Sequence, residues 1–115
     1  MNTGIATPSR TQARNDIIDI VMSEKTYWVY ILTNSNNSVL YTGVTSNLAK
    51  RMSEHASGKG SAFTKRYNVH KLVFAEAFRN VMEAILAEKK IKAGSRKKKI
   101  QLIESTNPEW KEIEY

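Results

Sequence analysis

The sequence contains no cysteine, has few prolines and glycines, and lacks any long hydrophobic run. Without cysteine there is no disulfide and no thiolate metal site, which fits a reducing compartment, and we expect a cytoplasmic protein. No apolar stretch approaches the roughly 20 residues of a membrane helix, so no membrane association is expected. The 115 residues, of which 41% are hydrophobic and 25% charged, leave room for one domain with a modest core.

Acidic residues are also scarce in one half of the chain, and the net charge is +7. Residues 1–25 hold three basic and three acidic side chains, whereas residues 50–99 hold 14 basic residues and four glutamates, a local excess of +10. A positive field of this extent indicates a polyanionic partner, most simply nucleic acid. A solvated basic surface without a ligand is the alternative that charge alone leaves open.

The chain divides into a leader and one domain. Residues 1–25 are polar, aperiodic and contain Pro8, so they are predicted to be a disordered leader to a domain spanning residues 26–115. Three segments rich in β-branched and aromatic residues are predicted as strands, and the first two form a hairpin. These strands are TYWVYIL (26–32), VLYTG (39–43) and HKLVFAEAF (70–78).

Three helices are predicted between and after these strands. They span residues 47–56, capped by Thr45 or Ser46, residues 81–93, between Asn80 and Gly94, and a last stretch from Ser95 to about Ile103. The intervening SGKGSAFTKRY (57–67) is expected to be a flexible basic loop. The order ββαβαα predicts an α+β fold, in which helices flank a small three-stranded mixed or antiparallel sheet.

The helix after Gly43 carries an arginine and a histidine one turn apart. Leu48 and Met52 define its buried side, and Arg51 and His55 fall together on one shoulder of that side. This pair suits a phosphate, because arginine supplies positive charge and imidazole supplies proton transfer. Alternatively, the arginine stem covers the core and the histidine packs within it.

Glu88 falls inside the apolar arc of the helix predicted over residues 81–93. At about 3.6 residues per turn it lies between Val81 and Ala84 around the helix, whereas Glu83 lies on the exposed side. An isolated buried carboxylate costs several kcal/mol, so Glu88 is expected to have a partner. A basic partner makes Glu88 structural and a divalent cation makes it part of an active site, and periodicity leaves both open.

Tyr30 and Tyr41 lie on the two arms of the predicted hairpin, near enough in register to be cross-strand neighbours. A phenol with a pKa of about 10 needs help from positive charge, supplied by Arg51, a metal ion or lysines, to act as a base near neutral pH. Tyrosines are also common in strands for structural reasons alone, so a purely structural role for Tyr30 and Tyr41 stays open.

The ordered combination of these residues resembles the GIY-YIG nuclease superfamily, and it is most similar to the small single-domain group related to the amino-terminal nuclease domain of the excinuclease subunit UvrC. The similarity covers roughly residues 26–103. The motifs that carry it are Trp28-Val29-Tyr30, Tyr41-Thr42-Gly43, Arg51 ten residues after Tyr41, His55 one turn later, and AILAEKKIK (84–92) with Glu88.

The resemblance implies hydrolysis of phosphodiester bonds in nucleic acid, most simply DNA during repair or turnover, with one divalent metal ion, Mg²⁺ or alternatively Mn²⁺. By position, Glu88 would hold the metal and Arg51 would bind the scissile phosphate. Tyr30 and Tyr41 would line the attacking side, one activating water and the other positioning it, with His55 assisting the proton transfer. Which tyrosine accepts the proton stays open.

Further basic residues are predicted to bind nucleic acid without reading its sequence. Phe63 and Tyr67 interleave with some of them and suit stacking on an unpaired base. Low specificity is expected unless a partner protein directs the chain, and the alternative function is a non-catalytic nucleic-acid-binding module that keeps the fold. The predicted basic residues are Lys59, Lys65, Arg66, Arg96, Lys97, Lys98 and Lys99.

Overall fold

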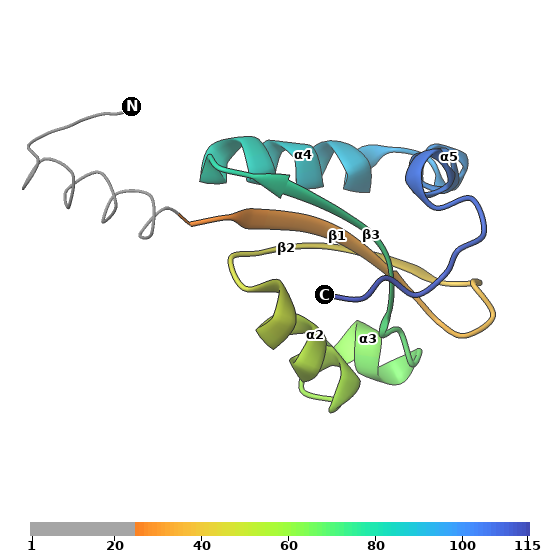
Figure 1. The fold of residues 1–115 in the computed structure, drawn as a ribbon. Helices are drawn as coiled ribbons and strands as arrows, with labels where there is room; N and C mark the ends of the chain where they lie inside the picture. The colour runs from red at the N-terminus through yellow and green to blue at the C-terminus, as the bar shows by residue number, and fades with distance from the viewer. Residues whose placement is uncertain (1–24) are drawn as a thin grey trace, which may run out of the picture.

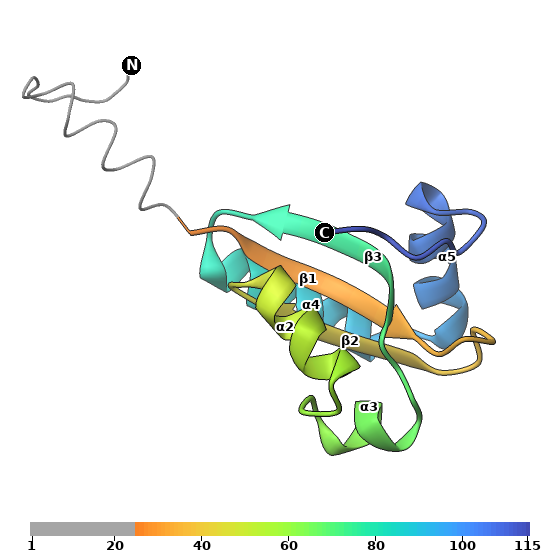
Figure 2. The ribbon, with the colours of Figure 1, turned by 60° about the horizontal axis from the view of Figure 1, so that its bottom comes forward.

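The computed structural model describes residues 25–115, so the leader predicted for residues 1–25 lies, except for Lys25, outside the described residues. The described residues form a three-stranded sheet with helices on both faces (Figure 1). All strand pairs are antiparallel, and the spatial order is β2-β1-β3, with β1 between its two neighbours (Figure 2). The strands are β1 (Tyr27–Thr33), β2 (Leu40–Thr45) and β3 (Lys71–Phe78).

The central strand β1 is covered on both faces, and its residues 29–33 are all buried. A strand in this position reads as a continuous apolar run rather than as an alternating one. The loop to β2 is held by Asn34, whose side-chain oxygen accepts hydrogen bonds from the backbone nitrogens of Ser38 and Val39 at 2.8 and 3.1 Å. This loop closes the predicted hairpin.

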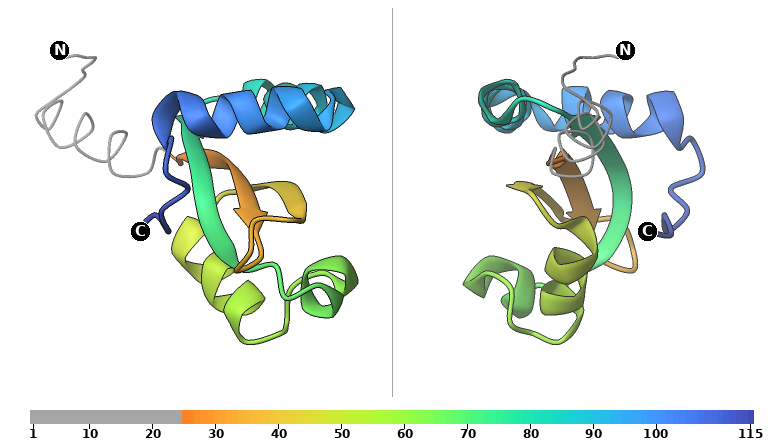
Figure 3. Two further views of the ribbon diagram at one scale, coloured as in Figure 1. Left: turned by 90° about the vertical axis from the view of Figure 1, so that its right-hand side faces the viewer. Right: turned by 60° about the vertical axis from the view of Figure 1, so that its left-hand side comes forward.

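Two helices cover each face of the sheet (Figures 1 and 3). On one face lie α2 (Leu48–Ala56) and α3 (Ala62–Arg66), and on the other lie α4 (Val81–Ala93) and α5 (Arg96–Thr106). The predicted α+β class is confirmed, the bounds of α4 are those predicted, and α5 runs three residues further. Within residues 25–115 no helix has the length and apolar character that crossing a membrane requires.

Two local predictions are wrong. The stretch expected to be a flexible loop over residues 57–67 contains α3, which Ser61 caps by accepting a hydrogen bond from the backbone of Thr64. The cap of α2 is Asn47, whose side chain accepts from the Lys50 backbone at 3.1 Å, rather than Thr45 or Ser46. The difference arises because β2 continues to Thr45, beyond its predicted end, so the helix begins later in the chain.

Alternate residues of β1 supply two buried clusters, one on each face of the sheet. Tyr30 and Leu32 pack with Met52 of α2, and Ile31 packs with Ile103 of α5. The chain after α5 returns to the sheet, because the backbone nitrogen of residue 113 donates to the backbone oxygen of residue 72 at 2.8 Å. Trp110 also packs on the second cluster.

Candidate active site

Tyr30 is buried in the central strand, and its phenol lies over Gly43 of the neighbouring strand. The Cα atoms of the two residues are direct partners across the β1–β2 pair. A Cβ atom on Gly43 would lie 2.5 Å from Cζ of Tyr30, so only glycine leaves room for the ring. Gly43 was predicted as the last residue of the second strand. It lies inside β2 instead, and its missing side chain positions the tyrosine.

Helix α2 places Arg51 and His55 against the Tyr30 hydroxyl. Nε of Arg51 donates to this hydroxyl at 3.5 Å, and Nε2 of His55 lies 3.2 Å from the same oxygen. Arg51 also pairs with Oε1 of Glu54 at 3.1 Å, which orients the guanidinium group. Core packing explains why His55 is buried, but it does not explain why both side chains converge on one hydroxyl.

The hydrogen bonds around Thr64 set the tautomer of His55. The Thr64 hydroxyl donates to the Ser61 carbonyl at 3.0 Å, so it accepts from Nδ1 of His55 at 3.1 Å. This arrangement assigns the proton to Nδ1, so that Nε2 is the acceptor for the Tyr30 hydroxyl. Gly60 makes room for the imidazole, because a Cβ atom there would lie 2.9 Å from Cε1 of His55.

Tyr41 borders the same cluster from β2. Its Cα atom pairs with that of Leu32, so the two tyrosines are diagonal rather than direct cross-strand neighbours. The ring centroid of Tyr41 lies 6.5 Å from that of Tyr30 and 5.7 Å from that of His55. Because Tyr41 is partly exposed whereas Tyr30 is buried, Tyr41 forms the open side of the cluster.

Glu88 lies on α4, which packs on β1 and β2 from the face of the sheet opposite α2 (Figure 1). Its side chain is 13% exposed, and its Oε2 lies 2.9 Å from Nζ of Lys92, whose side chain is 54% exposed. The charge of Glu88 is the smallest of the named influences on the pKa of Tyr30, and it raises that pKa. Glu88 thus has a basic partner one turn along the same helix. Val81, placed by periodicity in the same apolar arc, is exposed.

Burial is the main influence on the ionisation of the two central groups. It raises the pKa of Tyr30 above the usual 10.0, against the opposing hydrogen bond from Arg51. Burial and the charge of Arg51 lower the pKa of His55 below 6.5, and the bond to Tyr30 raises the pKa of Arg51. At neutral pH the pair is a neutral phenol and a neutral imidazole. Arg51 lowers the pKa of Tyr30, as expected of a nearby positive charge, but burial outweighs this effect.

Two hollows lie along the outer edge of β2, one beside each end of the strand. The first, about 350 Å³, is lined by Val44, Arg51 and other residues at the end of β2 and the start of α2. The second, about 320 Å³, is lined by Tyr41 together with Phe63 of α3 and two lysines, Lys92 and Lys99. The strand edge therefore has one hollow beside Arg51 and a second beside Tyr41.

The predicted nucleic-acid-binding residues lie in several places. Lys99 lines the hollow beside Tyr41. The guanidinium of Arg66 lies 5.4 Å from the centroid of the ring of Tyr67, the C-cap residue of α3. Arg96 donates to the backbone oxygen of Asn37 at 3.4 Å. The other four predicted residues are exposed on the surface, namely Lys59, Lys65, Lys97 and Lys98.

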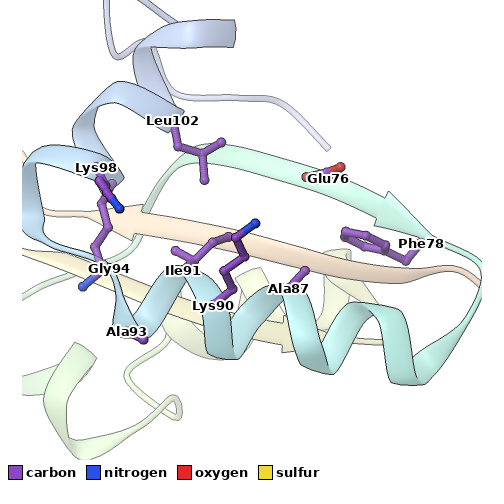
Figure 4. A pocket seen from close by; sticks show the side chains of 10 residues that line it. Glu76, Phe78, Ala87, Lys90, Ile91, Ala93, Gly94, Lys98 and Leu102 are labelled. Carbon is purple, nitrogen blue, oxygen red and sulfur yellow. The ribbon is translucent and has the colours of Figure 1, made fainter.

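Lys98 lies with Lys99 beside a separate hollow of about 540 Å³ between α4, α5 and β3 (Figure 4). Its walls include Ile91 and Leu102, and neither tyrosine of the candidate site contributes to it. Arg51, His55 and Glu88 are also absent from its lining. This hollow is therefore distinct from the cluster around Tyr30.

Sequence reasoning missed three residues of the candidate site. Gly60 and Thr64 hold the His55 ring, but they lie in a stretch expected to have no fixed structure. Lys92 was visible in principle, since a lysine four residues after a glutamate on a helix is a standard pairing signal.

Comparisons with known proteins show the family of this chain. The GIY-YIG catalytic domain family matches residues 26–101. The UPF0213 protein of Staphylococcus haemolyticus is 41% identical over 78 residues, which is 68% of this chain and 94% of that protein. The UPF0213 protein of Syntrophus aciditrophicus is 45% identical over 83 residues, covering 71% and 93%. The solution NMR structure of a UPF0213 protein from Bacillus halodurans shares 36% identity, covers 76% of this chain and 92% of that chain, and has a TM-score of 0.49.

The domain has a three-layer α+β fold, with one tyrosine on each of its first two strands. A helix contributes an arginine and a histidine that contact the first tyrosine. These features are typical of a small nuclease-type domain. The chain belongs to the GIY-YIG catalytic domain family, which is part of a nuclease superfamily. The relatives named above are small UPF0213 proteins whose length is almost fully matched.

Proposed function

We propose that this protein is a divalent-metal-dependent nuclease that hydrolyses phosphodiester bonds of DNA in repair or turnover. The observation that carries the proposal is the convergence of Arg51 and His55 on the Tyr30 hydroxyl, beside an open sheet edge. The basic residues alone would equally suit a binding module that keeps the fold. The shared hydroxyl favours hydrolysis, because binding by charge requires no buried proton acceptor.

Glu88 fits the role of metal ligand. Mg²⁺ is commonly held by one or two carboxylates, with waters and substrate phosphate oxygens completing its shell. A surface ion pair one helical turn apart contributes about 0.3–0.5 kcal/mol, which is less than the cost of burying a carboxylate, so Lys92 alone does not account for the position of Glu88. A metal bound there would polarise the phosphate and stabilise the leaving oxygen.

Arg51 would bind the scissile phosphate. Its contacts with Tyr30 and Glu54 engage Nε and one terminal nitrogen, and the other guanidinium hydrogens remain for phosphate oxygens. Its side chain is partly exposed and lines the hollow at the end of β2. Arg51 is therefore placed to offset negative charge that grows in the transition state.

Tyr30 and His55 would form a proton relay. The attacking water gives a proton to the Tyr30 oxygen while Tyr30 passes its own proton to Nε2 of His55. The water oxygen bonds to phosphorus, and the bond from phosphorus to the leaving sugar oxygen breaks, with that oxygen taking a proton from solvent. The resulting imidazolium keeps its Nδ1 proton on Thr64. Tyr41, on the open side, would position the water.

The relay predicts the pH dependence of cleavage. Since His55 must be neutral to accept the proton and its pKa is lowered, kcat/KM rises with pH through a value below 6.5 and is then flat to about pH 9. A phenolate acting without His55 would instead give a rate that climbs toward the raised pKa of Tyr30, above 10.0. Initial rates on a labelled oligonucleotide with saturating Mg²⁺ distinguish the two profiles, and a steady climb above pH 8 contradicts the relay.

Lys92→Met should increase metal affinity by about twofold, because the lysine and the metal compete for one carboxylate. Isothermal titration with Mn²⁺ measures the affinity directly. Lys89→Met is the matched control, since it removes an exposed lysine of the same helix. Equal affinities in the two variants would show that Lys92 does not compete with the metal.

The proposed function is tested by incubating the protein with labelled single- and double-stranded DNA. Cleavage that requires Mg²⁺ or Mn²⁺ and stops with EDTA supports the nuclease. Binding of the same DNA without cleavage under any metal condition supports the binding module instead.

A further inference from the structure

A row of aromatic rings leads from the candidate active site out along α3. The ring centroid of Tyr41 lies 6.0 Å from that of Phe63, with the planes inclined by 27°, and Phe63 lies 4.9 Å from Tyr67. The guanidinium of Arg66 lies beside the outermost ring. We refer to Tyr41, Phe63 and Tyr67 as the aromatic ladder.

The two outer rings of the ladder are not used by the core. Phe63 and Tyr67 are each 43% exposed, and neither belongs to the two buried clusters. Phe63 lies in α3 and Tyr67 is the C-cap residue four positions later, so the two rings lie on the same side. The buried residue of α3 is Thr64, which holds His55. The fold therefore anchors α3 through Thr64 and leaves an aromatic face open to solvent.

Positive charge accompanies the ladder along its length. The hollow that contains Tyr41 and Phe63 is also lined by Lys92 and Lys99, and Arg66 lies beside Tyr67. Rings alternating with cations suit a single nucleic-acid strand, because bases stack on the rings and phosphates contact the cations. A protein partner with an apolar surface would gain little from three cations beside the rings. A base inside a duplex does not offer a free face for stacking.

We propose that the aromatic ladder is a stacking site for unpaired bases, so that the substrate class is nucleic acid with a single-stranded stretch next to the bond to be cleaved. Bases on one side of the scissile phosphate stack on Phe63 and Tyr67. The phosphates that link these bases to the scissile phosphate contact Lys92 and Lys99. The link to cleavage rests on the proposed function. The stacking itself is a binding property and is measured without cleavage.

Binding in EDTA tests the ladder directly. The probe is a single-stranded oligonucleotide with 2-aminopurine at successive positions, and the comparison is a duplex of the same sequence. We expect quenching of the probe on binding, and a loss of single-strand affinity of about tenfold or more in Phe63→Leu and in Tyr67→Leu. Duplex affinity should change less than about twofold in both variants.

Two further variants keep the test decisive. Phe63→Trp keeps a stacking ring, so it should retain single-strand affinity and quenching even where the leucine variant disturbs α3. Tyr115→Leu removes an exposed aromatic from a different hollow, beside Trp28 and Leu48, and should leave affinity unchanged. Unchanged single-strand affinity in both leucine variants overturns the proposal, as does an equal loss for strand and duplex.

The proposed stacking site and the proposed nuclease activity can be disproved independently of each other. If the ladder variants lose single-strand affinity but the protein cleaves nothing, the stacking site stands and the nuclease falls. If the protein cleaves DNA but the ladder variants bind single strands as wild type does, the nuclease stands and the stacking site falls.

Discussion

Glu88→Gln should lower the rate of cleavage by about a thousandfold or more, since a bound metal supplies several kcal/mol of transition-state stabilisation and glutamine is a poor ligand for Mg²⁺. Glutamine keeps the shape of the side chain and removes its charge, so α4 should keep its place. Single-turnover cleavage with saturating Mg²⁺ gives the rate. Affinity for DNA in EDTA should not fall, because the substitution removes a negative charge.

Glu83→Gln is the control for this experiment. Glu83 is exposed on the same helix, one turn and a little more before Glu88, and its backbone nitrogen is held by the Asn80 cap. Its replacement should leave cleavage within about twofold of wild type. Full activity in Glu88→Gln would place the metal elsewhere and would leave the Glu88–Lys92 pair as a structural feature.

Gly43→Ala should be the second most damaging change. The added Cβ atom would overlap the Tyr30 ring, so the phenol must move away from Arg51 and His55. Displacing a reacting group by about 1 Å can cost a hundredfold in rate, and we expect at least this loss in kcat. Crowding of a packed ring should also destabilise the fold by about 1–3 kcal/mol.

Gly58→Ala is the control that separates the effect of Gly43→Ala on the cleavage rate from its effect on stability. Gly58 has φ of +81°, so alanine is strained there, but a Cβ atom would meet no atom within 4 Å. Urea unfolding should therefore show a loss of stability in both variants, whereas initial rates should show a loss of activity only in Gly43→Ala. Normal activity in Gly43→Ala would mean that the Tyr30 position does not matter for cleavage.

The fold was largely predictable because its elements are strongly patterned. The central strand is a continuous apolar run, and α4 lies between Asn80 and Gly94, which are both recognisable caps. The five-residue α3 was missed because one helical turn is too short to show a periodic pattern. That omission also hid Thr64 and its contact with His55.

The placement of Arg51 and His55 side by side was predictable from sequence, whereas the group on which they converge was not. The spacing of Arg51 and His55 on one helix indicated that they share a shoulder, but the Tyr30 hydroxyl that joins them depends on a glycine in another strand. The direction of the Tyr30 pKa could not be read from sequence. Positive charges near it are visible there, whereas burial, which dominates, is a property of the folded chain.

The most direct test of the central claim, that the Tyr30 hydroxyl lies at the centre of a phosphodiester-hydrolysing site, is cleavage of an oligonucleotide in ¹⁸O-labelled water. With Mg²⁺, wild-type protein should place ¹⁸O in the phosphate of the product, read by mass spectrometry, and Tyr30→Phe should do so at least about a hundredfold more slowly. Unlabelled or absent product from the wild type, or undiminished labelling by Tyr30→Phe, would contradict it.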